Sequence, residues 1–230
     1  MAMIRVIDME GTGLGPDAEV CEIGWCDIDL EGFRVMEPRG TLCRVAAMPP
    51  DVRAIHHIKA TDTADFPPYD RRILFEEACR AGVVALAAHN ADYESRFILG
   101  HLPLLCTYKA ALRHWPDAPG HSVFALLYWL EDKGEINFDP ALAHPPHRAM
   151  PDAYATAILL TKMLADGIGY IDLRQWTCEP RLLPTCPIGK YRGKPWVEVD
   201  TGFLEWISSK SDMDADIQWN AQREIDRRYQ

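Results

Sequence analysis

A short strand that ends in two carboxylates places the strongest constraint on what this chain can fold into. Ile4, Val6 and Asp8 alternate with their neighbours at the two-residue period of a β-strand. Glu10 continues the alternation, so Asp8 and Glu10 are expected to project from the same face at the strand's end. Such a pair alone is most often a solvated strand end. Two close carboxylates repel each other unless a cation lies between them, and Mg²⁺ and Mn²⁺ prefer oxygen ligands, so the pair predicts half of a metal site.

A second motif precedes an apolar helix later in the chain. Pro151 suits the first turn of a helix, and Asp152 then lies close to the helix N-terminus, where the helix dipole favours a negative side chain. His147 lies five positions before Asp152, on the loop. Histidine titrates near neutral pH, so His147 is a candidate general base that takes a proton from metal-bound water. Its neighbouring prolines and histidines are otherwise typical of an ordinary polar turn.

Together, Asp-x-Glu at a strand end and His-x-x-x-x-Asp at a helix start resemble the DEDDh branch of the DnaQ-like 3′-to-5′ exonucleases. Three further segments resemble that family in the same order: Ala54–Ile58, His89–Glu94 and Cys106–Ser122. The similarity covers roughly residues 1–166. It implies an α/β, RNase H-like fold with a mixed five-stranded sheet flanked by helices.

The resemblance also implies roles for individual residues. The metal ligands would be Asp8, Glu10, Glu94 and Asp152, which together with the general base His147 make up the catalytic set. Two Mg²⁺ or Mn²⁺ ions would be the cofactors. His89 and Asn90 fit the end of a buried strand equally well. The implied substrate-binding residues of this region are Met9, Gly11, Thr12, Leu14 as a wedge against the terminal base, Ile55, His56, His89 and Asn90.

The chain departs from the family pattern at two places. The family usually has Asp-Thr-Glu-Thr-Thr-Gly where this chain has Asp-Met-Glu-Gly-Thr-Gly over residues 8–13, so two hydroxyl groups near the substrate are missing. In the middle motif, alignment puts Glu94 at the position of the third acidic ligand, with Asp92 as the alternative. On a helix that begins near Asp92 these side chains would point about 200° apart, so only one of them can face the metals.

Hydrophobic periodicity predicts the order of the elements. Strands are predicted over residues 3–8, 20–28, 33–44 and 83–88. Helices are predicted over residues 51–57, 69–81, 93–99, 107–113, 122–131 and 152–165. Early strands followed by a further strand and several helices favour a mixed sheet flanked by helices.

The composition changes after residue 167. Prolines predict a linker, which divides the chain into a DEDDh exonuclease domain (1–168), a linker (169–186) and a small C-terminal module (187–230). Residues 187–196 predict a tight hairpin and contain Gly-Lys-Tyr-Arg-Gly, which resembles a module found behind exonuclease X-type enzymes.

This string carries both cations and aromatic rings. Lys190, Arg192 and Lys194 are candidate contacts to the phosphate backbone, with Tyr191 or Trp196 stacking on a base. In the alternative interpretation the aromatic residues form a miniature core and the cations are its solvated rim.

Composition limits the class of protein. The chain has 230 residues, 48% of them apolar, and a formal net charge of −10. This charge excludes a protein that coats long nucleic acid by electrostatics alone, but permits an enzyme that binds a few nucleotides at one end. The seven cysteines show no Cys-x-x-Cys spacing, which predicts reduced thiols and a cytoplasmic location. No membrane-spanning apolar run and no signal-peptide pattern is found.

These patterns predict a metal-dependent 3′-to-5′ exonuclease that acts on nucleic acid with a free 3′ end, DNA rather than RNA, and releases nucleoside 5′-monophosphates. An exoribonuclease of the same fold is one alternative, because the catalytic residues act on the phosphate and do not contact the sugar, which distinguishes RNA from DNA. A nucleic-acid-binding protein whose turnover is lost or weakened by the glutamate at position 94 is the other. Retention of His147, which binding alone does not require, argues against the latter.

Overall fold

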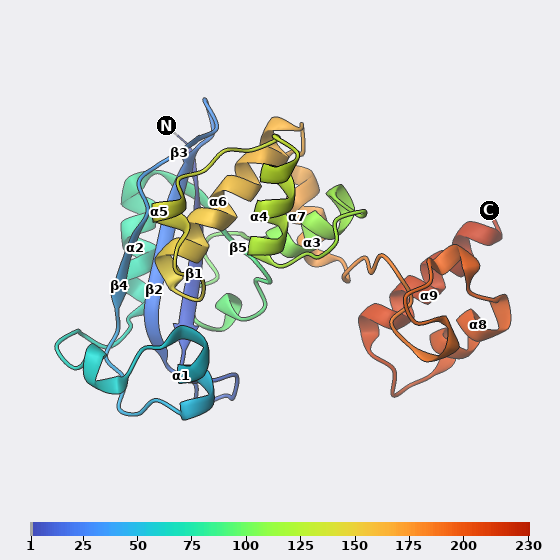
Figure 1. Ribbon diagram of the computed structural model, residues 1–230, viewed down its shortest axis with the longest axis horizontal. Helices are drawn as coiled ribbons and strands as arrows, with labels where there is room; N and C mark the ends of the chain where they lie inside the picture. Colours follow the sequence, from blue (N-terminus) through green and yellow to red (C-terminus); the bar gives the residue numbers. More distant parts are fainter. Residues whose placement is uncertain (1) are drawn as a thin grey trace.

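The computed structural model describes residues 2–230, apart from the side chain of residue 73. Its centre is a mixed sheet with the strand order β3-β2-β1-β5-β6, in which β4 also pairs with β2 (Figure 1). β1 (Met3–Gly11) lies antiparallel to β2 (Val20–Asp29) and parallel to β5 (Val83–Ala88). The predicted mixed sheet is confirmed.

The third predicted strand is divided into two pieces. β3 (Arg34–Val35) and β4 (Arg39–Leu42) both pair antiparallel with β2, on the edge away from β1. Pro38 lies between them and has no amide hydrogen for a sheet bond. The two pieces share one position, so the sheet is five positions wide, as predicted. The fifth position is β6 (Leu104–Cys106), parallel to β5, which is too short for periodicity to reveal.

Helices cover both faces of this sheet (Figure 1). α6 (Ala149–Ala165) packs on β1 and β2 from one side, and α2 (Arg71–Ala81) packs on β5 from the other. Residues 93–99, predicted as an α-helix, form only a single 3₁₀ turn, because Glu94 and its neighbours follow directly on a tight turn. No helix among the described residues is long and apolar enough to cross a membrane. The other helical segments before residue 169 are α1 (Pro50–His56), η1 (Ala60–Thr63), η2 (Glu94–Arg96), α3 (Thr107–His114), α4 (Val123–Asp132) and α5 (Pro140–Ala143).

Alternation along β1 decides which way the carboxylates point. Ile4 is buried in the core beneath α6, whereas Ile7 is buried in the core beneath α2. Asp8 and Glu10 continue the series of Ile4 at intervals of two residues. Both carboxylates therefore project on the side of the sheet that α6 covers.

A glycine brings the start of α6 close to the sheet. A Cβ atom at Gly24 would lie only 2.2 Å from the backbone of Ala149, so a larger residue would push the helix away. α6 begins at Ala149, which is earlier than predicted, and Pro151 and Asp152 lie in its first turn. This close approach sets Asp152 beside the end of β1.

The region predicted as a linker contains an unpredicted helix, α7 (Tyr170–Cys178). Leu173 is fully buried in the main core, and the backbone N–H of Cys106 donates to Thr177 Oγ1 at 2.8 Å. The linker interpretation is wrong for α7, because this helix packs against the exonuclease domain. The extended connection begins after α7 (Figure 1).

The C-terminal part of the chain has a small core of its own. α8 (Thr201–Ser209) packs against α9 (Ala215–Arg228), and two 3₁₀ turns, η3 (Gly189–Tyr191) and η4 (Trp196–Glu198), precede them. The buried members of this core are Cys186, Trp196, Val199, Leu204, Ile207 and Ala221.

The hairpin predicted over residues 187–196 is not formed. An isolated antiparallel bridge joins Thr185 to Pro195, and η3 occupies the space between them, because the glycines there adopt left-handed turns that interrupt any strand. Trp196 is buried, and its indole N–H donates to the Leu183 carbonyl at 2.8 Å. The expectation that Trp196 stacks on a base is therefore wrong, and the miniature-core alternative holds for this residue.

Candidate active site

Three carboxylates meet where β1 ends beside the first turn of α6. Oxygen atoms of Asp8, Glu10 and Asp152 all lie within 4.8 Å of one another. Burial raises the pKa of Glu10 to about 7, and the charges of Asp152 and Glu22 add to the effect. Burial likewise raises the pKa of Asp152 to about 7. The donor set is half-buried, all oxygen and negatively charged, which fits a divalent cation.

Glu94 completes this acidic cluster. Its side chain is buried, and its Oε2 atom has no hydrogen-bond partner among residues 2–230. Burial raises the pKa of Glu94 to about 8. Burial also raises the pKa of Asp8 well above its usual range, with Asp152 and then Glu94 adding to the effect. Asp92 is exposed, whereas Glu94 is buried and its charge acts on Asp8, so Glu94 lies beside the cluster.

His147 lies on the loop just before α6, as predicted. Its side chain is exposed, and its φ angle of 60° lies in the left-handed region, which histidine adopts more readily than most residues. The backbone N–H of His147 donates to Asp152 Oδ1 at 3.2 Å and to Oδ2 at 3.3 Å. The loop is thus tied to one carboxylate of the cluster, while the imidazole stays open to solvent.

A partly buried ion pair that the motifs did not reveal holds this loop. Glu22 on β2 lies directly across from Glu10 on β1. Arg148 donates to Glu22 through Nε at 2.9 Å and Nη2 at 2.5 Å, and the Ala149 N–H donates to Glu22 Oε2 at 3.0 Å. Glu22 therefore fixes the first residues of α6 to the sheet. Its signal in the sequence is an acidic residue between the apolar residues Cys21 and Ile23 in the first half of β2.

An open pocket of about 530 Å³ lies next to the acidic cluster. Leu14 and Ile55 present exposed apolar side chains there. His56 is buried, and within the part of the chain that the structure describes its Nε2 atom has no hydrogen-bond partner. A Cβ atom at Gly11 would lie 2.0 Å from the Tyr93 hydroxyl, so this position has no room for a side chain. The pocket is lined by Met9, Glu10, Gly11, Gly13, Leu14, Asp51, Val52, Ile55, His56 and Tyr93.

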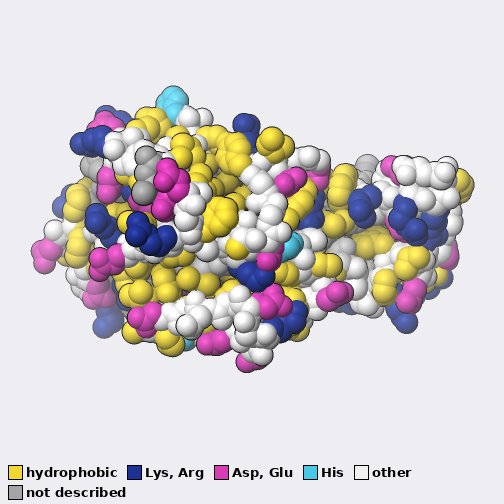
Figure 2. Space-filling model, turned by 90° about the horizontal axis from the view of Figure 1, so that it is seen from above, with side chains coloured by type: hydrophobic (Ala, Val, Ile, Leu, Met, Phe, Trp, Pro, Cys, Tyr) yellow, Lys and Arg dark blue, Asp and Glu magenta, His cyan; other side chains and the backbone are white. Residues whose placement is uncertain are grey.

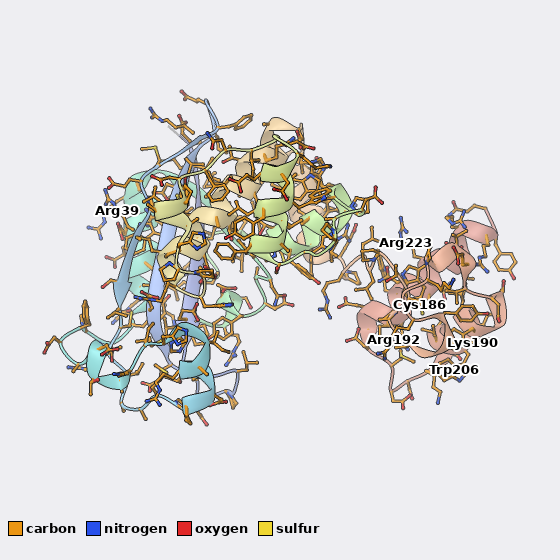
Figure 3. The ribbon with its side chains drawn as sticks, in the orientation of Figure 1. Arg39, Cys186, Lys190, Arg192, Trp206 and Arg223 are labelled. Atoms are coloured by element: carbon orange, nitrogen blue, oxygen red, sulfur yellow. The ribbon has the colours of Figure 1, made fainter. Side chains whose placement is uncertain are left out.

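Other residues predicted to bind substrate do not line this pocket. Thr12 Oγ1 accepts the Glu19 N–H at 3.0 Å, which braces the turn after β1. The His89 ring lies 3.0 Å from Thr107 Oγ1 and 2.8 Å from the His121 carbonyl, and burial lowers its pKa to about 4. Asn90 is exposed at the turn after β5, with a φ angle of 64°. Lys190 and Arg192 lie on the C-terminal module (Figure 3).

Comparison with known proteins identifies the family. No protein-family model matches the chain. Exodeoxyribonuclease 10 of Escherichia coli (strain K12) is 33% identical over 217 residues, which cover 91% of this chain and 92% of that protein. This chain belongs to the exonuclease X-type DnaQ-like DEDDh exonucleases.

Solved structures agree with this family. A complex of exonuclease X with 5′ overhanging duplex DNA is 29% identical, with a TM-score of 0.58 over 76% of this chain and 99% of that chain. The nuclease domain of 3′hExo, a DEDDh family member bound to rAMP, has a TM-score of 0.58 at 15% identity, over 75% of this chain and 94% of that chain. At that identity the likeness shows the fold alone, and the fold of the DEDDh exonuclease matches.

Proposed function

We propose that this chain removes nucleotides from the 3′ end of DNA as nucleoside 5′-monophosphates, using Mg²⁺ or Mn²⁺ held by its acidic cluster. Membership of the family makes it a divalent-metal-dependent 3′-to-5′ exonuclease. The observation that carries the proposal is the convergence of Asp8, Glu10 and Asp152 within 4.8 Å, next to a buried Glu94. Four neighbouring carboxylates repel one another when they are ionised, which is one cause of their raised pKa values, and bound cations would remove this repulsion.

The acidic cluster would hold two ions. Asp8, Glu10 and Asp152 would ligate one of them, and Asp8 with Glu94 would ligate the other. When bound, such ions lower the pKa of a ligated water and stabilise charge on the attacking and leaving oxygens. The carboxylates themselves hold their positions because β1 and α6 are both anchored in the core.

His147 is proposed as the general base. It would take the proton of the attacking water on a ring nitrogen, and the exposed position of its side chain lets that proton pass to solvent. The hydrogen bonds from its backbone N–H to Asp152 keep the loop beside the cluster. Glu22 is proposed to help position His147 indirectly, because it holds the two residues that follow it, Arg148 and Ala149.

The adjoining pocket is proposed to take the 3′-terminal nucleotide. Leu14 is 83% exposed and Ile55 is 49% exposed, so both have free apolar surface for the faces of a base. Met9 and Gly11 also line the pocket, and His56 Nε2 has no hydrogen-bond partner among residues 2–230. Roles for Thr12, His89 and Asn90 in binding substrate stay predictions, and for the first two the bonds within the protein favour a structural part.

DNA is proposed as the substrate because the relatives with the higher identities are an exodeoxyribonuclease and an exonuclease X bound to duplex DNA. The net charge of −10 and the interspersed acidic and basic side chains in Figure 2 support binding at a local site over binding along the whole surface. The seven cysteines are all unpaired, which supports the proposed cytoplasmic location. The division into an exonuclease domain, a connection and a C-terminal module stays a proposal, with α7 assigned to the exonuclease domain.

The experiment that tests this proposal follows degradation of matched oligonucleotides. Single-stranded DNA and RNA of one sequence, labelled at the 5′ end, are incubated with the chain and Mg²⁺, Mn²⁺ or a chelator. The proposal expects a ladder of DNA shortened from the 3′ end with either metal, and intact DNA with the chelator. Faster degradation of RNA would replace the proposed substrate by RNA, and intact oligonucleotides in every metal would refute the activity.

A further inference from the structure

Three aromatic rings lie in a row on the C-terminal module. The ring centroids of Tyr191 and Phe203 are 5.2 Å apart, and those of Phe203 and Trp206 are 5.3 Å apart with an interplanar angle of 24°. Phe203 packs over Gly189, where a Cβ atom would come within 2.8 Å of the ring. Trp206 ends the row and is 45% exposed. Packing of the module therefore accounts for Phe203 but leaves the indole of Trp206 open to solvent.

Cations flank both ends of this aromatic row. Lys190 Nζ lies 4.9 Å from the centroid of the Tyr191 ring, and Lys210 Nζ lies 5.3 Å from that of Trp206. Lys190 and Trp206 are close together on the module in the view of Figure 3. Among residues 2–230, neither Lys210 nor Arg192 has a carboxylate oxygen within 4.0 Å. Exchanging the ring contact of Lys210 for a phosphate would thus break no ion pair.

Asp200, the carboxylate that pairs with Lys190, already has other partners in the module. Asp200 caps α8 by accepting the Phe203 N–H at 2.8 Å, and it accepts the Tyr191 hydroxyl at 3.0 Å. Lys190 Nζ lies 3.7 Å from the same carboxylate, in an exposed pair that contributes little to stability. Trp196, by contrast, is buried in the module core. The exposed ring with its lysines has the composition of a surface that stacks an unpaired base and contacts its phosphates.

We propose that Trp206, with Lys190 and Lys210, forms a binding site for single-stranded DNA that is separate from the active site. The occupant is a single strand, because only unpaired bases offer a free face to the indole. This inference deepens the proposed function, on which it rests for the identity of the substrate. The site holds the strand away from the 3′ end that is being cut, so it acts on long substrates and not on dinucleotides.

Binding is measured on the full chain without catalysis. Fluorescence anisotropy of a 20-nucleotide single strand with chelator present gives the affinity of each variant. Trp206→Ala is expected to weaken binding about tenfold, which corresponds to the loss of one stacked base. Trp206→Phe keeps an aromatic face and should restore most of the affinity. Lys210→Ala should lower the slope of affinity against salt concentration by about one.

Controls separate this site from a folding defect and from the active site. Tyr229→Ala removes another exposed aromatic residue of the same module and should leave the affinity unchanged. Trp206→Met keeps apolar packing on Phe203 without an aromatic face, so it should weaken binding like Trp206→Ala while thermal unfolding stays as in the wild type. With metal present, Trp206→Ala should raise the ratio of KM for the 20-mer to KM for a dinucleotide about tenfold.

Several results would overturn the inference. Wild-type affinity in Trp206→Ala and Trp206→Met would do so, as would an equal loss in Tyr229→Ala. Concentration-dependent dimerisation that Trp206→Ala abolishes, without a change in DNA affinity, would assign this surface to a second copy of the chain. Because binding is measured with chelator, a wild-type chain that binds through Trp206 yet cleaves nothing would refute the proposed function alone.

Discussion

Replacement of Glu94 by Gln should abolish cleavage and at the same time stabilise the metal-free protein at alkaline pH. Burial holds the pKa of Glu94 at about 8, against an ordinary value of 4.5. The folded chain therefore binds the proton more tightly than the unfolded chain, and its stability falls as the pH rises between these two values. At about 1.4 kcal/mol per pH unit, this gap sets an upper limit of about 5 kcal/mol at pH 9. Glutamine carries no charge and avoids that penalty.

The assay pairs denaturant unfolding at pH 5 and pH 9 with cleavage of a labelled single strand. Glu94→Gln should lose turnover and show a smaller drop in free energy of unfolding between the two pH values. Glu94→Asp should retain or improve cleavage, because it restores the acid usual in the family. Asp92→Asn is the matched control: it should leave cleavage unchanged, since Asp92 is exposed, and it should reduce the pH-dependent drop only slightly, since the charge of Asp92 is the smallest of the causes that raise the pKa of Glu94. An inactive Asp92→Asn with an active Glu94→Gln would show that Asp92, and not Glu94, is the third acidic ligand.

Three further substitutions test the parts around the cluster. His147→Ala should lower turnover by roughly 10²–10⁴-fold, while the rise in melting temperature on adding Mn²⁺ survives; an unchanged turnover at neutral pH would exclude His147 as the base. Arg148→Ala removes the charged partner of the buried Glu22, which keeps only the Ala149 N–H, and should cost about 1–3 kcal/mol in denaturant unfolding at neutral pH; an unchanged free energy of unfolding would contradict the role of this pair. Leu173→Ala should destabilise by about 2–5 kcal/mol, and an unchanged midpoint would show that α7 is only a linker.

Local patterns were sufficient to predict the parts of the site that depend on alternation and helix ends. Asp8 and Glu10 lie on one face because β1 is regular, and Asp152 lies in a first helical turn because Pro151 precedes it. The pairing of Glu22 with Arg148 joins residues 126 positions apart. No local pattern reveals such a contact, because it depends on the register between β1 and β2 and on the packing of α6.

The fold was less predictable where segments are short or held by tertiary contacts. β6 has three residues, too few to show a period, and parallel pairing with β5 is what makes it a strand. α7 lies in a stretch that reads as a linker because prolines follow it, yet Leu173 fixes it to the core. The hairpin prediction was wrong because Gly189 and Gly193, the expected hairpin bends, also permit the 3₁₀ turn η3.

The most direct test of the account is the first product released from a single strand of DNA that is labelled at its 3′-terminal nucleotide. Wild-type chain is compared with Asp8→Asn in Mn²⁺ and in chelator, and the products are separated by size and by the position of their phosphate. Wild type should release the labelled nucleoside 5′-monophosphate first, and chelator should stop this release. Asp8→Asn should be inactive. Release of the label last, release in chelator, or full activity of Asp8→Asn would contradict the account.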